Sequence, residues 1–438
     1  MDIKVSKDKA KTGLNGEFTI PADKSISHRA VMFSSLAKGT SIIKNFSLGA
    51  DCLSTKSLFE KLGAKIEFLD ERVLKITSNG TLIKSTSPLN CGNSGTTMRL
   101  CSGILAGQNF DSILFGDESL SKRPMKRVIT PLEMMGGQIE SVDYKAPLKI
   151  FGTKLSGITY KSPIASAQVK SCVLLAGLNA EGKTSVVEPF LSRNHTELLL
   201  KYMGANITTG TWANKKELAG IDGTAVTVEK SVLNPVEIDV AGDISSAAFF
   251  IVAGLIVPNS DIIIKNVGLN PTRTGILDVV KRMQGDIEIL SQSEVSGELV
   301  GDIRVRYSKL VGCEISGSDI PRLIDELPVI ALLATQAEGE TVVKNAEDLR
   351  KKESDRISTI VNGLISIGAN IDEKSDGFIV YGGTKLKGDA ELETFHDHRL
   401  AMTYYVAGLL CEKEILIKGF EWVDISFPEF LQIFENLW

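Results

Sequence analysis

Apolar and polar positions along the chain repeat in one pattern. Six times, an apolar stretch of helical character reaches a small-residue stop and passes into a run of β-forming residues. The copies read SSLAKGTSIIKNF, GILAGQNFDSILF, LLAGLNAEGKTSVV, VAGLIVPNSDIIIKNV, LLATQAEGETVVKNA and VAGLLCEKEILIKG. Their central alanines are Ala37, Ala106, Ala176, Ala253, Ala334 and Ala407. A spacing of roughly 70 to 80 residues exceeds a solenoid period and suits a small βαβαββ unit.

The second half of each unit repeats as well. A helix reaches a glycine and passes into a strand in FEKLGAKIEF, LEMMGGQIES, KYMGANITT, KRMQGDIEIL and LISIGANIDE. Glycine suits a helix C-terminus because it tolerates positive φ. The sixth copy ends inside its helix, at Glu429 to Trp438, so it needs a partner strand. The segment Met1 to Ile20, which alternates at Ile3 and Val5, could supply that strand.

The repeats set the expected fold class and domains. A chain of 438 residues exceeds what one hydrophobic core usually serves, so two domains are expected. Six units predict an α/β (α+β) protein with three βαβαββ units in each domain. Because the N-terminal strand would complete the last unit, residues 1–20 plus 236–438 should form the domain that contains both termini. Residues 21–235 would be an inserted domain, with the active site in the interdomain cleft.

Composition narrows the class of protein. Hydrophobic residues make up 43% and charged residues 24%, and the net charge is -5 without a basic tract, which argues against a nucleic-acid binder. The apolar run from Ala247 to Pro258 is too short to span a bilayer, and the start of the chain lacks a signal-peptide core. We therefore expect a cytoplasmic protein without membrane contact. The six cysteines form no CxxC pair, and the four histidines are dispersed, so no zinc site is evident.

Charged and small polar residues gather at the predicted helix starts. Before the first helices stand Lys24, Ser25, Arg29; Asn93, Gly95, Thr96, Arg99; Ser166, Gln168, Lys170; Asp243, Ser245; Asp325, Glu326; and His398, Arg399. Before the second helices stand Arg123, Arg193, Arg273, Lys352, Glu353 and Arg356. Helix N-termini attract anions and arginine grips carboxylates and phosphates bidentately, so a ligand with two or more anionic groups is indicated. Any one of these motifs alone would suit an ordinary N-cap better than a binding site, and the weight lies in their recurrence at matching places in the repeats.

Other motifs and residues give weaker indications of function. GNSGTT lacks the pattern of a nucleotide P-loop, and no nucleophile elbow surrounds Ser25. Cys91 and Cys101 are expected to be packing residues, and His195 a surface or capping histidine rather than a general base.

The motifs DKSISHRA, GNSGTTMR, SKRPM, ASAQVKS, NPTRTG, IDELP, KESDR and DHRLAM occur in this order over nearly the whole chain. In this the chain resembles the 5-enolpyruvylshikimate-3-phosphate synthase family. The resemblance implies the enolpyruvyl transferase fold of the inside-out α/β barrel type, which agrees with the repeat count. It also implies no metal and no organic cofactor.

The resemblance also implies roles for individual residues. Shikimate 3-phosphate would be held by Lys24, Ser25, Arg29, Ser166, Ala167, Gln168 and Arg193. Phosphoenolpyruvate would be clamped by Gly95, Thr96, Arg123, Arg356 and Arg399, with Lys24 also reaching it. Asp325 and Lys352 would bind the ring hydroxyls.

The implied reaction transfers the enolpyruvyl group of phosphoenolpyruvate to the 5-hydroxyl of shikimate 3-phosphate and releases phosphate by addition and elimination, on the route to chorismate and the aromatic amino acids. The hydroxyl must lose a proton while C3 gains one, so acid and base groups are needed on opposite sides. Asp325 is the candidate base, and Glu353 with Lys24 would serve C3. Binding of both anions should close the domains by induced fit.

The chain departs from the family pattern near its C-terminus. Ile425 and Ser426 precede Phe427 and Pro428 where some members carry a lysine, and Asp348 stands where some carry asparagine. A glycine at position 95 implies, by the same resemblance, room for the inhibitor glyphosate.

The nearest alternative is a UDP-N-acetylglucosamine enolpyruvyl transferase, which typically has a reactive cysteine in the loop that reads DESLSKRPM here. A non-catalytic phosphate-binding relative is a third possibility, and a monomer is expected because the repeats are satisfied within one chain.

Overall fold

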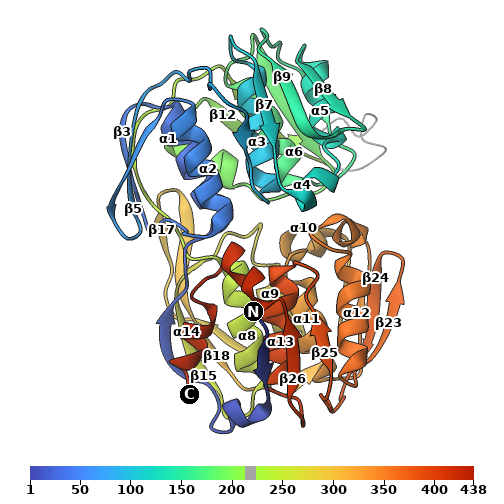
Figure 1. Ribbon diagram of the computed structural model, residues 1–438. Helices are drawn as coiled ribbons and strands as arrows, with labels where there is room; N and C mark the ends of the chain where they lie inside the picture. Colours follow the sequence, from blue (N-terminus) through green and yellow to red (C-terminus); the bar gives the residue numbers. More distant parts are fainter. Residues whose placement is uncertain (213–222) are drawn as a thin grey trace. The chain divides into compact units, whose positions relative to one another are not determined.

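The structure, a computed structural model, describes residues 1–212 and 223–438. The chain forms two compact units (Figure 1). Unit 1 comprises Met1–Asp23, Ala241–Glu294 and Leu299–Trp438, and unit 2 comprises Lys24–Val240 and Val295–Glu298. The sequence placed the two main boundaries near residues 20 and 235, a few residues before each observed crossing. The assignment of Val295–Glu298 to unit 2 was not predicted by the repeat pattern.

Unit 2 contains three four-stranded sheets of the same internal order. The first is β14 (Glu237–Asp239), β3 (Lys38–Lys44), β5 (Val73–Asn79) and β4 (Lys65–Asp70). The second is β6 (Leu89–Asn90), β7 (Ser112–Phe115), β9 (Lys145–Phe151) and β8 (Gln138–Val142). The third is β10 (Thr159–Lys161), β11 (Lys183–Glu188), β13 (Gly223–Glu229) and β12 (Ile207–Trp212). In each sheet the first pair of strands is parallel and the other pairs are antiparallel.

Two helices accompany each of these sheets. The first helix of each repeat is α1 (Lys24–Leu36), α3 (Gly95–Ala106) or α6 (Ala167–Gly177). The second is α2 (Ala50–Lys61), α5 (Lys126–Met134) or α7 (His195–Tyr202), and a short α4 (Glu118–Lys122) precedes α5. In the second and third sheets, α3 and α6 each connect two neighbouring strands that pair in parallel, which is the connection a βαβ crossover requires.

Unit 1 repeats the same strand order in two four-stranded paths. One runs through β2 (Asn15–Thr19), β15 (Asp261–Gly268), β18 (Glu298–Arg306) and β16 (Asp286–Ile289), with β17 (Ser293–Val295) paired to β18. The other runs through β20 (Glu314–Ile315), β22 (Glu340–Val343), β24 (Gly377–Tyr381) and β23 (Asn370–Lys374). The pair β19 (Leu310–Val311) and β21 (Ala337–Glu338) is separate. The helices are α8 (Ile244–Ile256), α9 (Gly275–Arg282), α10 (Ile320–Leu323), α11 (Leu327–Thr335), α12 (Arg356–Ser366), α13 (His398–Gly408) and α14 (Phe430–Glu435).

The N-terminal segment completes two sheets rather than one. β1 (Ile3–Val5) pairs antiparallel with β26 (Ile415–Lys418), which also pairs in parallel with β25 (Glu391–Glu393), so the predicted partner strand of the last repeat is confirmed. β2 instead pairs in parallel with β15. The strand that precedes α1 in the sequence thus belongs to a unit 1 sheet, whereas β14, which precedes α8, pairs with β3 in unit 2.

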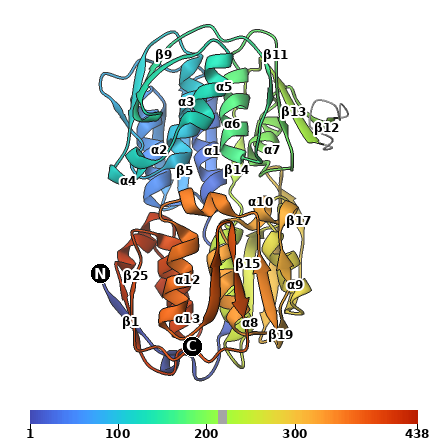
Figure 2. The same ribbon diagram turned by 90° about the vertical axis from the view of Figure 1, so that its right-hand side faces the viewer.

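The first helices form the core of each unit. Every residue of α8, α11 and α13 is buried; α8 and α11 are apolar on nearly all sides, whereas α13 also buries polar side chains such as Arg399 and Thr403. In unit 2, α3 and α6 approach so closely that a Cβ atom on Gly103 would lie 2.1 Å from the carbonyl oxygen of Cys172. Figure 2 shows the helices of each unit running alongside one another between their strands.

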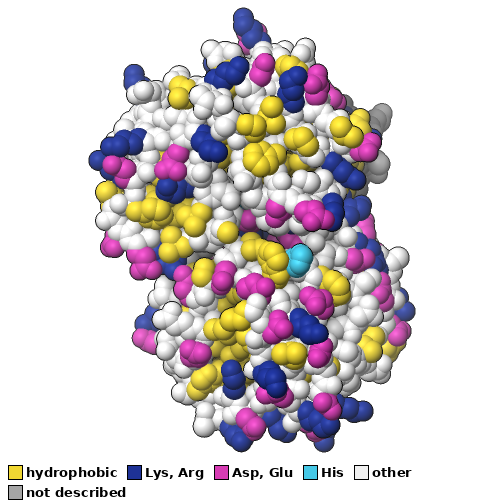
Figure 3. Space-filling model, viewed as in Figure 1, with side chains coloured by type: hydrophobic (Ala, Val, Ile, Leu, Met, Phe, Trp, Pro, Cys, Tyr) yellow, Lys and Arg dark blue, Asp and Glu magenta, His cyan; other side chains and the backbone are white. Residues whose placement is uncertain are grey.

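The face of the molecule shown in Figure 3 carries charges of both signs. On the face shown in Figure 3, lysine and arginine side chains are interspersed with aspartate and glutamate on both units. Over residues 1–212 and 223–438, no helix combines the length and the apolar character needed to cross a membrane.

Candidate functional site

The first cation of the candidate site, Lys24, begins α1. Its Nζ lies 3.0 Å from Oδ2 of Asp51 in the first turn of α2, and the two side chains are 20% and 10% exposed. Five residues further on, Arg29 is buried and donates hydrogen bonds to neutral oxygens on three helices. Its Nε donates to Thr196 Oγ1 at 2.7 Å, one Nη to Ser171 Oγ at 2.9 Å and the other to the Ser25 carbonyl at 2.9 Å.

A second group of contacts joins the starts of α3 and α6. Arg99 donates to Gln168 Oε1 at 2.6 Å, and Gln168 Nε2 donates to Thr96 Oγ1 at 3.1 Å. A Cβ atom on Gly95 would lie 2.8 Å from an Nη atom of Arg99 and 3.5 Å from one of Arg123. Predicted residues of two repeats are therefore joined by hydrogen bonds. Because Gly95 has no side chain, it leaves space beside the guanidinium of Arg99.

Arg123 follows α4 and is buried. Its guanidinium donates to Asn93 Oδ1 at 2.8 Å and to Ser119 Oγ at 3.3 Å. The Asn93 amide donates in turn to Asp117 Oδ2 at 2.8 Å, and Asp117 caps α4 by accepting from the Leu120 N–H. The GNSGTT loop and the DESLSKRPM loop are thereby tied together.

The remaining predicted residues of unit 2 lie at the starts of α6 and α7. Ser166 is the N-cap of α6 and is followed by Ala167, and both are partly exposed. Ser166 N–H donates to Glu188 Oε1 at 2.9 Å. Arg193, also partly exposed, stands two residues before α7. These positions agree with a ligand that approaches the helix N-termini of this unit.

In unit 1 the predicted residues gather around Asp325, a largely buried carboxylate between α10 and α11. Lys352 Nζ lies 3.1 Å from its Oδ1, Arg356 3.4 Å from the same oxygen, and Arg399 4.0 Å from its Oδ2. Arg399 also donates to the Asp325 carbonyl at 3.1 Å. Cations at these distances favour the ionised form of a carboxylate, which is the form that a proton acceptor needs.

Arg356 is itself held by carboxylates. It is 1% exposed and makes a bidentate pair with Asp397, through Nε at 2.7 Å and Nη2 at 3.0 Å, and Glu353 lies 2.6 Å from Nη2. Burial opposes the charge, but Asp397 and Glu353 outweigh it and raise the pKa of Arg356 above its usual value. The predicted clamp residue is therefore a fixed cation.

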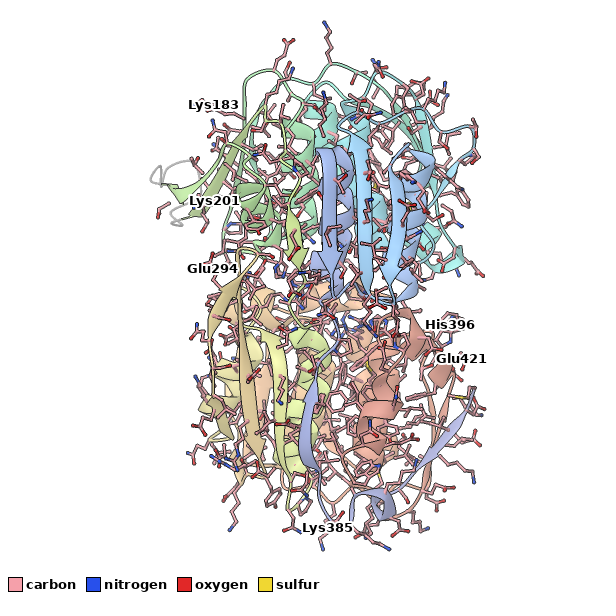
Figure 4. All side chains as sticks on the ribbon, turned by 90° about the vertical axis from the view of Figure 1, so that its left-hand side faces the viewer. Lys183, Lys201, Glu294, Lys385, His396 and Glu421 are labelled. Atoms are coloured by element: carbon pink, nitrogen blue, oxygen red, sulfur yellow. The ribbon has the colours of Figure 1, made fainter. Side chains whose placement is uncertain are left out.

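Asp397 was not among the predicted residues. It is fully buried and caps α13 by accepting from the Arg399 N–H at 3.0 Å. Phe395 and His396 directly before it both have left-handed backbone, with φ of 50° and 61°. This turn directs Asp397 inward while His396 stays exposed, and the His396 ring lies against Trp422 in a tilted arrangement with ring centroids 4.4 Å apart. Figure 4 shows His396 at the surface. An aspartate directly before a predicted helix was the sequence signal.

The ionic network of unit 1 extends to the start of α8. Arg399 Nη1 lies 3.6 Å from Glu326 Oε1, and Glu326 accepts a hydrogen bond from Ser245. The cation beyond Ser245 is Arg273, which pairs with Asp23 at 3.1 Å and Asp243 at 3.2 Å. The sequence suggested that clustered cations at helix starts would make the site strongly anion-selective. In unit 1, each buried arginine lies close to at least one carboxylate. The prediction of a site that is anion-selective through its cations alone is therefore incomplete.

Three side expectations can be compared with the structure. His195 is not a surface residue: it is buried at the start of α7 with Nδ1 2.7 Å from Glu298 Oε1. Cys91 and Cys101 are buried free thiols, and burial raises the pKa of Cys91 to about 12, as expected of packing residues. Among the described residues, no group of His, Cys, Asp and Glu side chains has an arrangement that could hold a metal ion.

Comparisons with known proteins identify the family of the whole chain. Residues 9–434 match the family model of EPSP synthase (3-phosphoshikimate 1-carboxyvinyltransferase). A 3-phosphoshikimate 1-carboxyvinyltransferase of Thermoanaerobacter sp. (strain X514) is 51% identical over 440 residues, which cover 100% of both chains. The EPSP synthase structure from Acinetobacter baumannii has a TM-score of 0.86 at 39% identity, covering 100% of this chain and 98% of that one.

The enolpyruvyl transferase NikO from Streptomyces tendae shares the fold at 15% identity, with a TM-score of 0.79 over 99% of this chain and 96% of that one. The observed fold is thus the enolpyruvyl transferase fold, a mixed α/β architecture built from many small mixed sheets. On the match of both sequence and structure over its full length, this chain belongs to the EPSP synthase (3-phosphoshikimate 1-carboxyvinyltransferase) family.

Proposed function

We propose that the chain moves the enolpyruvyl group of phosphoenolpyruvate onto the 5-hydroxyl of shikimate 3-phosphate by addition and elimination of phosphate. As a family member it is a transferase of the shikimate pathway, which leads to the aromatic amino acids. The observation that carries the assignment of roles is Asp325, a buried carboxylate with Lys352, Arg356 and Arg399 around it.

In this proposal unit 2 binds shikimate 3-phosphate. Lys24, Ser25, Arg29, Ser166, Ala167, Gln168 and Arg193 would make the phosphate and ring contacts. The support is that these residues lie at the starts of α1, α6 and α7, where unpaired N–H groups favour a phosphate. Gly95, Thr96 and Arg123 would contribute to phosphoenolpyruvate, together with Arg356 and Arg399 of unit 1.

Unit 1 would supply Asp325 and Glu353 for the proton transfers, and unit 2 would supply Lys24. Asp325 accepts the proton of the 5-hydroxyl of shikimate 3-phosphate while the oxygen of that hydroxyl attacks C2 of phosphoenolpyruvate. Glu353 and Lys24 protonate C3 and later remove a proton from it as phosphate leaves. The fixed cations position the two anions and stabilise the charge that develops, which is usually the larger part of such catalysis.

The same proposal covers the domains and the quaternary state. Each unit would be a domain of three βαβαββ repeats in an inside-out α/β barrel, and both would serve one active site that closes when both substrates bind. We propose a monomer, since β1 completes the last sheet within the chain. We propose a cytoplasmic enzyme, because free cysteines are what a reducing compartment maintains.

Glyphosate is proposed as an inhibitor. A methyl group on Gly95 would meet Arg99 at 2.8 Å, so an alanine there must displace the guanidinium and fill the space next to Arg123. Gly95→Ala should therefore raise the glyphosate inhibition constant by about tenfold or more, an energy of roughly 1.4 kcal/mol. An unchanged inhibition constant would exclude a role for this space.

Two alternatives are separated by one experiment. The purified protein is incubated with phosphoenolpyruvate and either shikimate 3-phosphate or UDP-N-acetylglucosamine, and phosphate release is followed. Release with shikimate 3-phosphate alone supports the proposal. Release with the nucleotide sugar instead identifies the rival transferase, and release with neither, despite binding of shikimate 3-phosphate, identifies a non-catalytic relative.

A further inference from the structure

One buried cation in unit 2 is not used by the proposed reaction. Lys170 lies in α6, is 0% exposed and has no predicted ligand role. Its ammonium has three N–H donors, and three acceptors surround it: Glu197 Oε1 at 2.8 Å, Glu188 Oε2 at 3.0 Å and the Ser192 carbonyl at 3.1 Å. The ammonium therefore has one hydrogen bond, to the Ser192 carbonyl, and two carboxylates at ion-pair distance.

The charge of Lys170 is maintained in this environment. Burial by itself disfavours the ammonium, but Glu197 and Glu188 together leave the pKa of Lys170 above its usual value. A fully buried charge that is both paired and hydrogen-bonded fixes the geometry around it. If one of its partners moved away, a buried charge would be left without compensation, which is energetically costly.

Glu188 passes this constraint to the ligand-binding segments. It is the last residue of β11, and its Oε1 accepts from the Ser166 N–H at 2.9 Å. Its carboxylate also accepts from the Ser192 N–H at 3.3 Å and from the Ser192 hydroxyl at 2.7 Å. One carboxylate thus holds the N-cap of α6 and the residue directly before Arg193.

Glu197 connects Lys170 to a different element. It lies in α7, next to Thr196, which accepts the hydrogen bond from Arg29 Nε. Within residues 1–212 and 223–438, the structure gives the Glu197 carboxylate no polar partner besides Lys170. The two glutamates therefore share a cation but differ in what they hold.

We propose that Lys170 and Glu188 are positioning residues for shikimate 3-phosphate, acting through the Ser166 N-cap and the segment 189–194 that carries Arg193. This inference rests on the proposed ligand roles of Ser166 and Arg193. It assigns the pair no contact with substrate. Its effect is on binding of shikimate 3-phosphate and not on the chemical step.

The two glutamates provide a matched test. Glu188→Gln keeps the shape but turns an NH₂ group toward a donor, so one of the bonds to Ser166, Ser192 or Lys170 is lost. Glu197→Gln removes a charge from the same cation and leaves Ser166 and Ser192 bonded. Isothermal titration with shikimate 3-phosphate should give a Kd about tenfold weaker for Glu188→Gln and within about twofold of wild type for Glu197→Gln. At saturating substrate, kcat should stay within about threefold of wild type for both variants.

Equal weakening in both variants, in proportion to their loss of thermal stability, would overturn the proposal in favour of a purely structural role. Should Glu188→Gln fail to fold, Ser192→Ala removes the hydroxyl bond to Glu188 without leaving a buried charge unpaired, and should weaken binding about threefold. An unchanged Kd in that variant would also overturn it. Wild-type protein is titrated in parallel: absence of shikimate 3-phosphate binding there rejects the proposed function itself, a result distinct from failure of the positioning role.

Discussion

The two units hold their buried arginines in different ways. In unit 2, oxygens of Thr196, Ser171 and Ser25 accept hydrogen bonds from Arg29, and the oxygens of Asn93 and Ser119 accept from Arg123. In unit 1, Arg356 is bound by Asp397 and Glu353, and Arg273 by Asp23 and Asp243. Neutral oxygens therefore take part in holding the buried arginines of unit 2, whereas carboxylates take part in holding those of unit 1.

The difference teaches what each cluster can do. A guanidinium held by hydroxyls keeps its positive charge available to a phosphate, whereas one held by carboxylates has much of its charge compensated. A cluster that contains carboxylates can, however, exchange protons. Unit 2 is therefore suited to binding an anion, and unit 1 to fixing a base such as Asp325 among cations.

The largest expected effect tests this contrast directly, through the free energy of unfolding in urea. Arg356→Met leaves buried Asp397 and Glu353 without their cation and should cost about 3–5 kcal/mol. Arg29→Met, the matched change in unit 2, leaves hydroxyls that still bond to each other, since Ser171 and Thr196 lie 2.6 Å apart. Its cost should be about 1–2 kcal/mol. Equal losses would show that the two kinds of partner are energetically alike.

The next effect is on turnover. Asp325→Asn keeps an oxygen for Lys352 and Arg356 but cannot accept a proton, so kcat should fall by about a hundredfold or more. The Kd for shikimate 3-phosphate should change little, because unit 2 provides most of the proposed contacts. Steady-state phosphate release and titration calorimetry measure the two quantities. Retained turnover would move the base to Glu353 or Lys24.

The sequence predicted the helices and strands well where packing sets the pattern. The six apolar helices ending near Ala37, Ala106, Ala176, Ala253, Ala334 and Ala407 are all present. The repeat pattern could not show that β2 and β14 pair with strands far along the chain, because local periodicity carries no information on partners. For the same reason it gave no indication that Val295–Glu298 belongs to unit 2.

The candidate site was predictable in part. Charged residues at helix starts identified Arg29, Asp325, Arg356 and Arg399. Their partners were not predictable, because Asp397 and Asp51 resemble ordinary helix-start aspartates until the fold places them against a cation. Ligand roles came from the resemblance to a family and remain predictions until variants are measured.

A third prediction compares helix packing in the two units. Gly103→Ala places a methyl group 2.1 Å from the Cys172 carbonyl oxygen, a backbone atom that cannot move aside alone. It should cost about 2 kcal/mol even after the gain in helix propensity. Gly254→Ala in α8 meets only side-chain ends of Ile262 and Val305, at 3.1 Å or more, and should be within about 1 kcal/mol of wild type. Urea unfolding measures both, and a smaller loss for Gly103→Ala than for Gly254→Ala would contradict the close approach of α3 and α6.

The smallest expected effect concerns Asp243, one of the two carboxylates that pair with Arg273 in unit 1. Burial and the neighbouring Asp23 raise the pKa of Asp243 above 3.8, although Arg273 and Arg399 act in the opposite direction. A raised folded-state pKa means that the folded protein holds this proton more tightly than the unfolded chain does. The contribution of Asp243 to stability is therefore fully present below pH 3.8 and declines as pH rises through the folded-state pKa.

Asp243→Asn isolates this contribution, because asparagine caps a helix about as well as aspartate and can still accept the bond from Ser245 N–H. Relative to wild type, the variant should gain stability as pH is raised from about 3.5 to 7, because it lacks the proton equilibrium through which Asp243 loses its contribution. Urea unfolding at a series of pH values gives the difference. A difference that falls with rising pH would mean that Arg273 dominates, and that unit 1 stabilises the Asp243 anion as firmly as it stabilises its arginines.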